Sequence, residues 1–158
     1  MVRLAAELLS RHPLLNGLEH SQLERLSALG ELESYSPDEE VVRQGTLGDS
    51  LYLVLSGHVA VYAGDSPRPL ATLHPGEFFG EMSLVEPALR SATVRAADTL
   101  EVFRLPHVAV VRLFETEPAL MNRILIHVVR ALSQRLRRTN DLIGSVERLS
   151  EYLAGSML

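Results

Sequence analysis

The segment from Phe78 to Leu84, together with Arg90, combines residues suited to binding a phosphate with residues suited to binding a sugar. The guanidinium of Arg90 can donate two hydrogen bonds at once to a phosphodiester. Gly80 and the pair Ser91 and Ala92 suit a tight turn that presents backbone N–H groups to an anion. Glu81 lies nine positions before Arg90 and offers a carboxylate acceptor for a ribose hydroxyl. These residues predict a pocket for a ligand with both groups, such as a cyclic nucleotide.

Each of these residues also has a plainer interpretation. A single arginine or glutamate in a loop is usually a solvated charge, and Gly80 can simply close a turn. Phe78 and Phe79 are expected to pack in the core below the site. The joint occurrence of these residues favours binding over the plainer interpretation.

The order of these residues resembles the phosphate-binding cassette of the cyclic nucleotide-binding domain family. The family includes bacterial catabolite activator proteins, protein kinase regulatory subunits and gated channels. Its pattern is Phe-Gly-Glu-(Leu/Met)-(Ser/Ala)-Leu, a short turn and Arg-(Ser/Ala)-Ala-Thr-Val, and each position is matched between residues 79 and 94. Many members have Pro before the Arg, whereas Leu89 stands here and Pro87 lies two residues earlier.

The resemblance implies a role for each matched residue. It implies that Glu81 accepts a hydrogen bond from the ribose 2′-hydroxyl, that Arg90 pairs with the cyclic phosphate, and that Ser91 and Ala92 cap the phosphate. The ligand-binding residues expected from the cassette are Phe79, Gly80, Glu81, Met82, Ser83, Arg90, Ser91, Ala92 and Thr93. The ligand is expected to be cyclic AMP, with cyclic GMP or a cyclic dinucleotide left open.

Residues outside the cassette are expected to contact the base of the ligand. Alignment to the family puts Leu70 and Leu73 on a strand beneath the base. An ungapped match from Arg90 onward puts Arg135 and Leu136 where catabolite activators contact the adenine amino group. The family uses small hydroxyl residues there, so Arg135 either bonds or stacks on the base, or only fixes the register of its helix.

Glycines and β-branched residues divide the chain into three parts. Residues 1–30 show short helical patterns with breaks at Pro13 and Gly17. Residues 31–106 alternate short apolar runs with glycines, which predicts an antiparallel β jelly-roll barrel, the fold that the resemblance also implies. Residues 107–158 return to a helical period, with a break near Pro118 and a long helix from about Ala119. The fold class is therefore mainly β with flanking helices, and the cassette spans residues 78–94.

The long C-terminal helix carries a stripe of apolar residues at alternating spacings of three and four, which is typical of a coiled coil. Arg135 and Thr139 interrupt the stripe, and Gly144 weakens the helix enough to permit a kink or a break. Beyond Asp141 the stripe is expected to need a partner, so we predict a parallel homodimer. Its apolar residues are Leu125, Val128, Leu132, Leu142, Val146, Leu149 and Leu153.

Composition excludes several classes of protein. The 158 residues are 46% apolar, enough for one sizeable core. The absence of cysteine excludes disulfides and thiolate metal sites. A formal net charge of −5 argues against a broad DNA-binding surface, and the cluster at Arg130, Arg135, Arg137 and Arg138 is expected to be a solvated face. No apolar run approaches the roughly 20 residues of a membrane span, so we expect a cytoplasmic protein.

The leading hypothesis is a non-enzymatic receptor that couples ligand binding to movement of its C-terminal helix. The histidines show no metal-ligand spacing and no recognised nucleophile is present, so no catalytic residue, metal or cofactor is expected. Only 18 residues follow Asn140, too few for a helix-turn-helix domain. The alternatives are a dimeric scaffold with a changed or vestigial pocket and the sensor part of a longer regulator. The Met1 start favours a stand-alone sensor with an unknown downstream protein.

Overall fold

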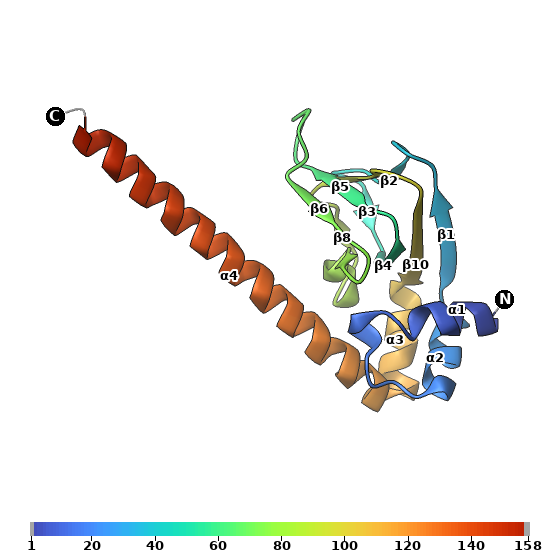
Figure 1. Cartoon of the computed structure of the whole chain (residues 1–158). Coiled ribbons are helices and arrows are strands. Elements are labelled where there is room, and N and C mark those ends of the chain that lie inside the picture. The colour runs from blue at the N-terminus through green and yellow to red at the C-terminus, as the bar shows by residue number, and fades with distance from the viewer. Residues whose placement is uncertain (1, 157–158) are drawn as a thin grey trace. The chain divides into compact units, whose positions relative to one another are not determined.

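Short helices open the chain, as the spacing of the leucines predicts. The structure is a computed structural model that describes residues 2–156. Helix α1 (Val2–Leu9), the 3-10 turn η1 (Pro13–Leu15) and helix α2 (His20–Ser27) come first (Figure 1). Their apolar sides are buried, including Leu9 and Leu26, while polar residues face outward.

Two four-stranded antiparallel sheets and one two-stranded ladder follow the first helices. The first sheet has the order β1-β10-β4-β7 and the second has the order β2-β9-β5-β6. The strands are β1 (Glu31–Tyr35), β2 (Glu40–Val42), β3 (Leu47–Gly48), β4 (Ser50–Ser56), β5 (Val59–Tyr62), β6 (Ala71–Leu73), β7 (Phe78–Phe79), β8 (Ala88–Leu89), β9 (Thr93–Ala96) and β10 (Leu100–Pro106). The mainly β fold with flanking helices is confirmed, and the arrangement is a jelly roll whose sheets are not closed into a barrel.

The core of the jelly roll is built from residues that alternate along the strands. Val54 and Val102 face the same cluster as Val59 and Val94 of the second sheet. This matches the period of two by which successive side chains of a strand point to opposite faces. Phe78 and Phe79 are 2% and 6% exposed, so the prediction that both pack in the core is confirmed.

Two helices follow the last strand. Helix α3 (His107–Thr116) starts directly after β10, and helix α4 (Pro118–Ser156) begins one residue after Glu117. Proline at the first position of α4 fits because that position has no intrahelical N–H bond to lose. Glu117 also forms an ion pair with Arg25 at 2.5 Å, which ties this junction to α2.

The chain divides into two compact units, one ending at Ile124 and the other beginning at Leu125. The second unit is the remainder of α4, which continues as one helix through Gly144. Large apolar side chains stay exposed along it, among them Leu142 at 66% and Val146 at 62%. A helix in a protein gains most of its stability from packing an apolar face against other structure. This exposed apolar surface is therefore suited to a partner.

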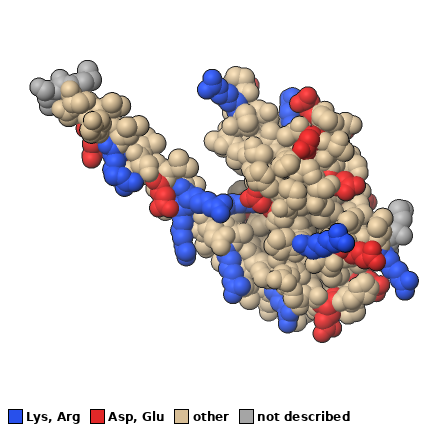
Figure 2. Space-filling view, viewed as in Figure 1, with Lys and Arg blue, Asp and Glu red and all other residues tan. Residues whose placement is uncertain are grey.

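Charged side chains of both signs are interspersed on the face of the molecule drawn in Figure 2. Several acidic groups already neutralise arginines; Glu40, for example, pairs with Arg43 at 2.8 Å and with Arg95 at 3.6 Å. Within the described residues, no helix is long and apolar enough to cross a membrane.

Candidate ligand-binding site

Gly80 forms the corner of the predicted cassette. Its φ of +76° is left-handed, and it links β7 to the 3-10 turn η2 (Glu81–Leu84). A Cβ at this position would lie 2.5 Å from the Ser50 carbonyl oxygen and 2.6 Å from Arg90 Nη1. The corner therefore requires glycine for its backbone conformation and also for the space beside the arginine.

The backbone at Arg90 is held on both sides by hydrogen bonds. Its N–H donates to the Thr46 carbonyl at 2.8 Å, and its own carbonyl accepts from Gly45 N–H at 2.9 Å. The preceding residue, Leu89, pairs with Leu47 in the β3–β8 ladder. Leu89, which replaces the proline found in many family members, thus lies in a short strand that positions Arg90.

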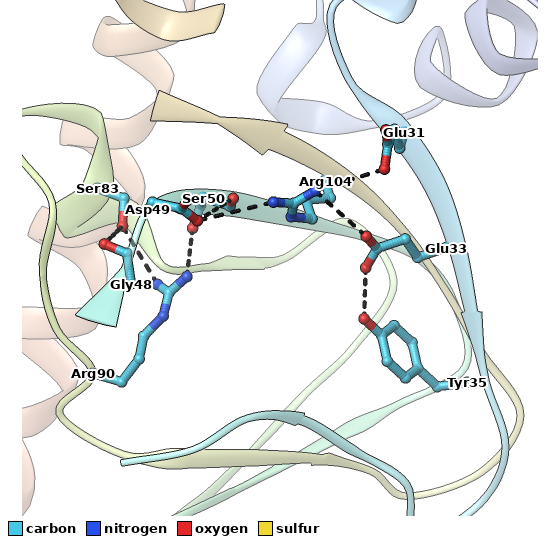
Figure 3. Close-up of polar contacts among 9 residues, drawn as sticks. All are labelled: Glu31, Glu33, Tyr35, Gly48, Asp49, Ser50, Ser83, Arg90 and Arg104. Atoms are coloured by element: carbon cyan, nitrogen blue, oxygen red, sulfur yellow. Dashed lines mark hydrogen bonds and ion pairs between the residues drawn. The ribbon is translucent and has the colours of Figure 1, made fainter. Parts of the chain in front are cut away.

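The Arg90 guanidinium points back toward the start of β4 (Figure 3). Nη2 donates to the Ser50 carbonyl at 2.9 Å, and Nη1 lies 3.5 Å from Ser83 Oγ. Gly48 lines the guanidinium so closely that a Cβ there would overlap its Nε. The cation is thus fixed in orientation beside the cassette turn, with N–H groups available for a phosphate.

Ser83 joins the cassette turn to two other elements. It is 2% exposed, its hydroxyl donates to the Gly48 carbonyl at 3.2 Å, and its own carbonyl lies 2.7 Å from His107 Nδ1. These bonds tie η2 to β3 and to the start of α3. The cassette turn is thus bonded to the first residue of that helix.

The remaining cassette residues have different degrees of exposure. Glu81 is partly exposed at the start of η2, and across the described residues its carboxylate has no ion-pair or hydrogen-bond partner, so it is open to a ligand hydroxyl. Met82 is 61% exposed, Ser91 is exposed and Ala92 is partly buried. Thr93 begins β9, where its Oγ1 accepts from Gln44 N–H at 3.0 Å.

Four predicted base contacts lie outside the cassette. Leu73 is partly buried against the core of the jelly roll, whereas Leu70 is 72% exposed and lies just before β6. Arg135 and Leu136 lie on α4, within the second unit. The contact of these residues with a base stays a prediction.

The sequence alone did not identify three residues that hold the Arg90 guanidinium in place, namely Gly48, Ser50 and Tyr52. Ser50 acts through its backbone carbonyl, so its residue type gives no signal, and Gly48 is one of several glycines near turns. Tyr52 lies in a continuous apolar run, yet its ring stands under the guanidinium at 5.7 Å from ring centroid to Cζ. The aromatic residue inside an otherwise aliphatic strand is the one signal that singles out this position.

A separate groove of about 890 Å³ opens beside the loop between β5 and β6. Thr93 is the cassette residue that contributes to its wall; the others include Glu40, Arg43, Gln44, Tyr62 and Arg95. These two arginines share the wall with two carboxylates, Glu40 and Asp65, and both pair with Glu40, so the groove offers little uncompensated positive charge. The groove is therefore poorly suited to an anionic ligand.

Comparison with known proteins agrees with the geometry of the cassette. The model of the cyclic nucleotide-binding domain matches residues 32–117. The cyclic AMP receptor protein of Thermus thermophilus is 34% identical over 136 residues, covering 82% of this chain and 59% of the relative. A cAMP-dependent protein kinase regulatory subunit of Colletotrichum orbiculare is 30% identical over 121 residues, covering 77% of this chain and 31% of the relative.

Solved structures show the same fold. A cyclic nucleotide-binding domain from Methylobacillus flagellatus superposes with a TM-score of 0.75 at 26% identity, covering 89% of this chain and 80% of that chain. The Thermus thermophilus catabolite activator protein gives a TM-score of 0.70 at 30% identity, with 85% and 63% covered.

The chain spans about three fifths of the Thermus relative and about one third of the kinase regulatory subunit. The match includes β1 through α3 and therefore the whole cassette, with its left-handed glycine and its restrained arginine. By sequence, by fold and by the geometry of this turn, the chain belongs to the cyclic nucleotide-binding domain family.

Proposed function

We propose that this protein is a receptor for a cyclic nucleotide and that its preferred ligand is cyclic AMP. The observation that carries the proposal is the placement of the Arg90 guanidinium beside Gly80 and the first turn of η2, held by the Ser50 carbonyl. In the bound state Arg90 pairs with the cyclic phosphate, and backbone N–H groups of η2, Ser91 and Ala92 surround it. Glu81 accepts a hydrogen bond from the 2′-hydroxyl.

The relatives support cyclic AMP as the first ligand to test. Two of them are named for cyclic AMP, the Thermus receptor protein and the fungal kinase regulatory subunit. These names describe those proteins, and the assignment to this chain rests on its cassette. The role is regulatory, with no catalytic step assigned to any residue of the chain.

The signal is proposed to leave the jelly roll through its C-terminal helices. Ser83 and His107 already join η2 to the start of α3 at 2.7 Å, so a ligand that moves η2 changes the bonding of that helix. A ligand shifts an equilibrium only by its difference in affinity for the two states. Repositioning of α4 therefore requires that the ligand binds one arrangement of the helices more tightly than the other.

The second unit is proposed to form a parallel homodimer. Its apolar stripe includes Leu132, Leu142, Val146, Leu149 and Leu153, which are 36% to 66% exposed. The alternating spacing of three and four places these side chains on one face of α4, where a second copy can cover them. The dimer would bring two ligand sites into one assembly.

Calorimetric titration tests the receptor assignment. The protein is unfolded and refolded to remove any bound ligand and is then titrated with cyclic AMP, with cyclic GMP as competitor. We expect a dissociation constant in the micromolar range or below, and a loss of at least about 100-fold in Arg90→Ala because a charged partner of the phosphate is removed. Arg95→Ala is the matched control, since Arg95 is exposed and pairs with Glu40.

The possible results separate the hypotheses. Equal affinity of wild type and Arg90→Ala would contradict the assignment of the phosphate to Arg90. If neither cyclic AMP nor cyclic GMP binds, the remaining hypothesis is a dimeric scaffold with a changed or vestigial pocket. Tighter binding of cyclic GMP would retain the receptor and change its ligand.

A further inference from the structure

Two aromatic rings form a stacked pair directly beneath the cassette. Tyr52 of β4 and Phe79 of β7 are register partners in adjacent strands, with ring centroids 4.8 Å apart and planes inclined by 4°. They are 7% and 6% exposed, and both belong to the core cluster between the two sheets. Phe79 directly precedes Gly80, so the pair joins the middle of the sheet to the corner of the cassette.

The Arg90 guanidinium lies over the free face of this pair. Its Cζ is 5.7 Å from the centroid of the Tyr52 ring, within the range in which the negative face of an aromatic ring attracts a cation. The edge of the guanidinium is bonded to the Ser50 carbonyl, two residues before Tyr52 on the same strand. One strand thus contacts the cation twice, through a carbonyl that accepts a hydrogen bond from Nη2 and through the ring that lies under Cζ.

Charged groups also surround the strand partner of Tyr52. Its strand partner in β10 is Arg104, which lies 3.8 Å from Glu33, 3.6 Å from Glu31 and 3.9 Å from Asp49 (Figure 3). Burial raises the pKa of Tyr52 and the Glu33 charge raises it further, while Arg104 and Arg90 act in the opposite direction. The phenol therefore stays neutral under physiological conditions and lies between two arginines of fixed position.

We propose that Tyr52 is a positioning residue for Arg90: its ring, supported by Phe79, holds the guanidinium in the orientation that receives the ligand phosphate. The expected effect of Tyr52 on ligand affinity rests on the proposed function, because it requires that Arg90 binds the ligand phosphate. The contact joins two residues of this chain, so it can be tested independently of ligand binding. A role in core packing alone would give Tyr52 no specific effect on Arg90.

Three variants separate positioning from packing. Tyr52→Leu removes the ring and is expected to weaken cyclic AMP binding roughly tenfold, because Arg90 loses one of its two fixed contacts with β4. Tyr52→Phe keeps the ring and is expected to restore most of the affinity. Phe103→Leu is the packing control, since Phe103 is fully buried in neighbouring β10 on the opposite side of the sheet, against Gly30. It is expected to lower stability with a change in affinity of less than about twofold.

Nuclear magnetic resonance of the ligand-free protein reports the contact directly. Protons on Cδ and Nε of an arginine over a ring face shift upfield, and the signals of Arg90 are identified by their loss in Arg90→Lys. We expect upfield shifts in wild type, Tyr52→Phe and Phe103→Leu, and their disappearance in Tyr52→Leu. Should Tyr52→Leu fail to fold, the Arg90 shifts of the wild type and of Tyr52→Phe still decide the question.

Two results would overturn the inference. One is an unshifted Arg90 signal in the wild type, which would mean that the guanidinium does not lie over the ring. The other is an equal loss of affinity in Tyr52→Leu and Phe103→Leu, which would reduce Tyr52 to a packing residue. Absence of nucleotide binding in the wild type, with the upfield shift present, would contradict the proposed function and leave the contact established.

Discussion

Gly80 and Gly64 share a left-handed backbone but differ in their surroundings. A Cβ at Gly80 would meet the Ser50 carbonyl and Arg90, whereas a Cβ at Gly64, with φ of +60°, would meet nothing within 4 Å. Replacing either with alanine introduces the strain of a left-handed non-glycine residue, about 1–2 kcal/mol. Comparing the two alanine variants therefore separates the free-energy cost of the left-handed conformation from the cost of the steric overlap of the added methyl group.

We expect Gly80→Ala to reduce the free energy of unfolding by at least about 1 kcal/mol more than Gly64→Ala. The added methyl group also pushes Arg90 from its place, so ligand affinity should fall strongly in Gly80→Ala and little in Gly64→Ala. Urea unfolding and calorimetric titration measure the two effects. Equal losses for both variants in both measurements would show that the space beside Gly80 has no role.

At the scale of single residues, the sequence points to groups whose side-chain chemistry suits the proposed ligand. Arg90 and Glu81 stand out because a phosphate and a sugar require those types of residue, and their roles stay predictions. Ser50 acts through its carbonyl and Tyr52 through the register of β4 with β7, and neither property is written in a residue type. Their contribution requires knowledge of which strands are neighbours.

At the scale of elements, His12 joins the N-terminal helical segment to Glu77, the residue directly before β7 and the cassette. It is 3% exposed, its Nδ1 accepts from Leu14 N–H at 3.2 Å, and its Nε2 lies 3.1 Å from the Glu77 carbonyl. Both bonds require the neutral ring with its proton on Nε2. Burial holds the pKa of His12 below the ordinary value of 6.5, partly offset by the Glu77 carbonyl.

This arrangement predicts a loss of stability in acid. Because the folded state lowers the pKa of His12, the contribution is fully present above pH 6.5 and is lost as the pH falls through the lower pKa of the folded state. The unfolding free energy should decrease by up to about 1.4 kcal/mol per pH unit between 6.5 and the lower pKa of His12 in the folded state. Urea unfolding between about pH 8 and about pH 5 measures the slope.

His12→Gln should flatten that slope, since glutamine does not titrate in this range. His20→Gln is the control because the His20 side chain is 65% exposed, and it should keep the slope of the wild type. An unchanged slope in His12→Gln would assign the pH dependence to other groups.

The elements differ in how well the sequence predicted them. Apolar runs separated by glycines predicted the β region that contains the long strands β4 and β10, and the helical period identified α4. The two-residue strands β3, β7 and β8 are too short for any period, and they form only because neighbouring segments already hold the chain in place. The cassette depends on these short strands. Its motif could therefore be recognised in the sequence, whereas its geometry could not be predicted from it.

At the scale of the whole molecule, the exposed stripe of α4 predicts self-association. Leu149 is 58% exposed on the stripe, and Ile143 is 52% exposed on the same helix but outside the alternation of three and four. Burying such side chains between two copies removes apolar surface from water at about 25 cal/mol per Å². Association should therefore depend on Leu149 and not on Ile143.

Sedimentation equilibrium tests this prediction. We expect a dimer for the wild type and for Ile143→Glu, and a weakening of the dimer by at least about tenfold for Leu149→Glu, since a buried unpaired carboxylate is costly. A monomer for the wild type, or equal behaviour of the two variants, would contradict the proposed seam.

The antiparallel pairing of β1 with β10 joins residues 31–35 to residues 100–104. During synthesis, β1 leaves the ribosome long before β10, its partner in the sheet, exists. The first sheet therefore cannot be completed until residue 106 has emerged, whatever the speed at which the first helices form. A truncated nascent chain that ends just after the cassette would carry the whole ligand-recognition motif and still lack β10. It would therefore expose the edge of β1, a surface that favours aggregation or capture by a chaperone.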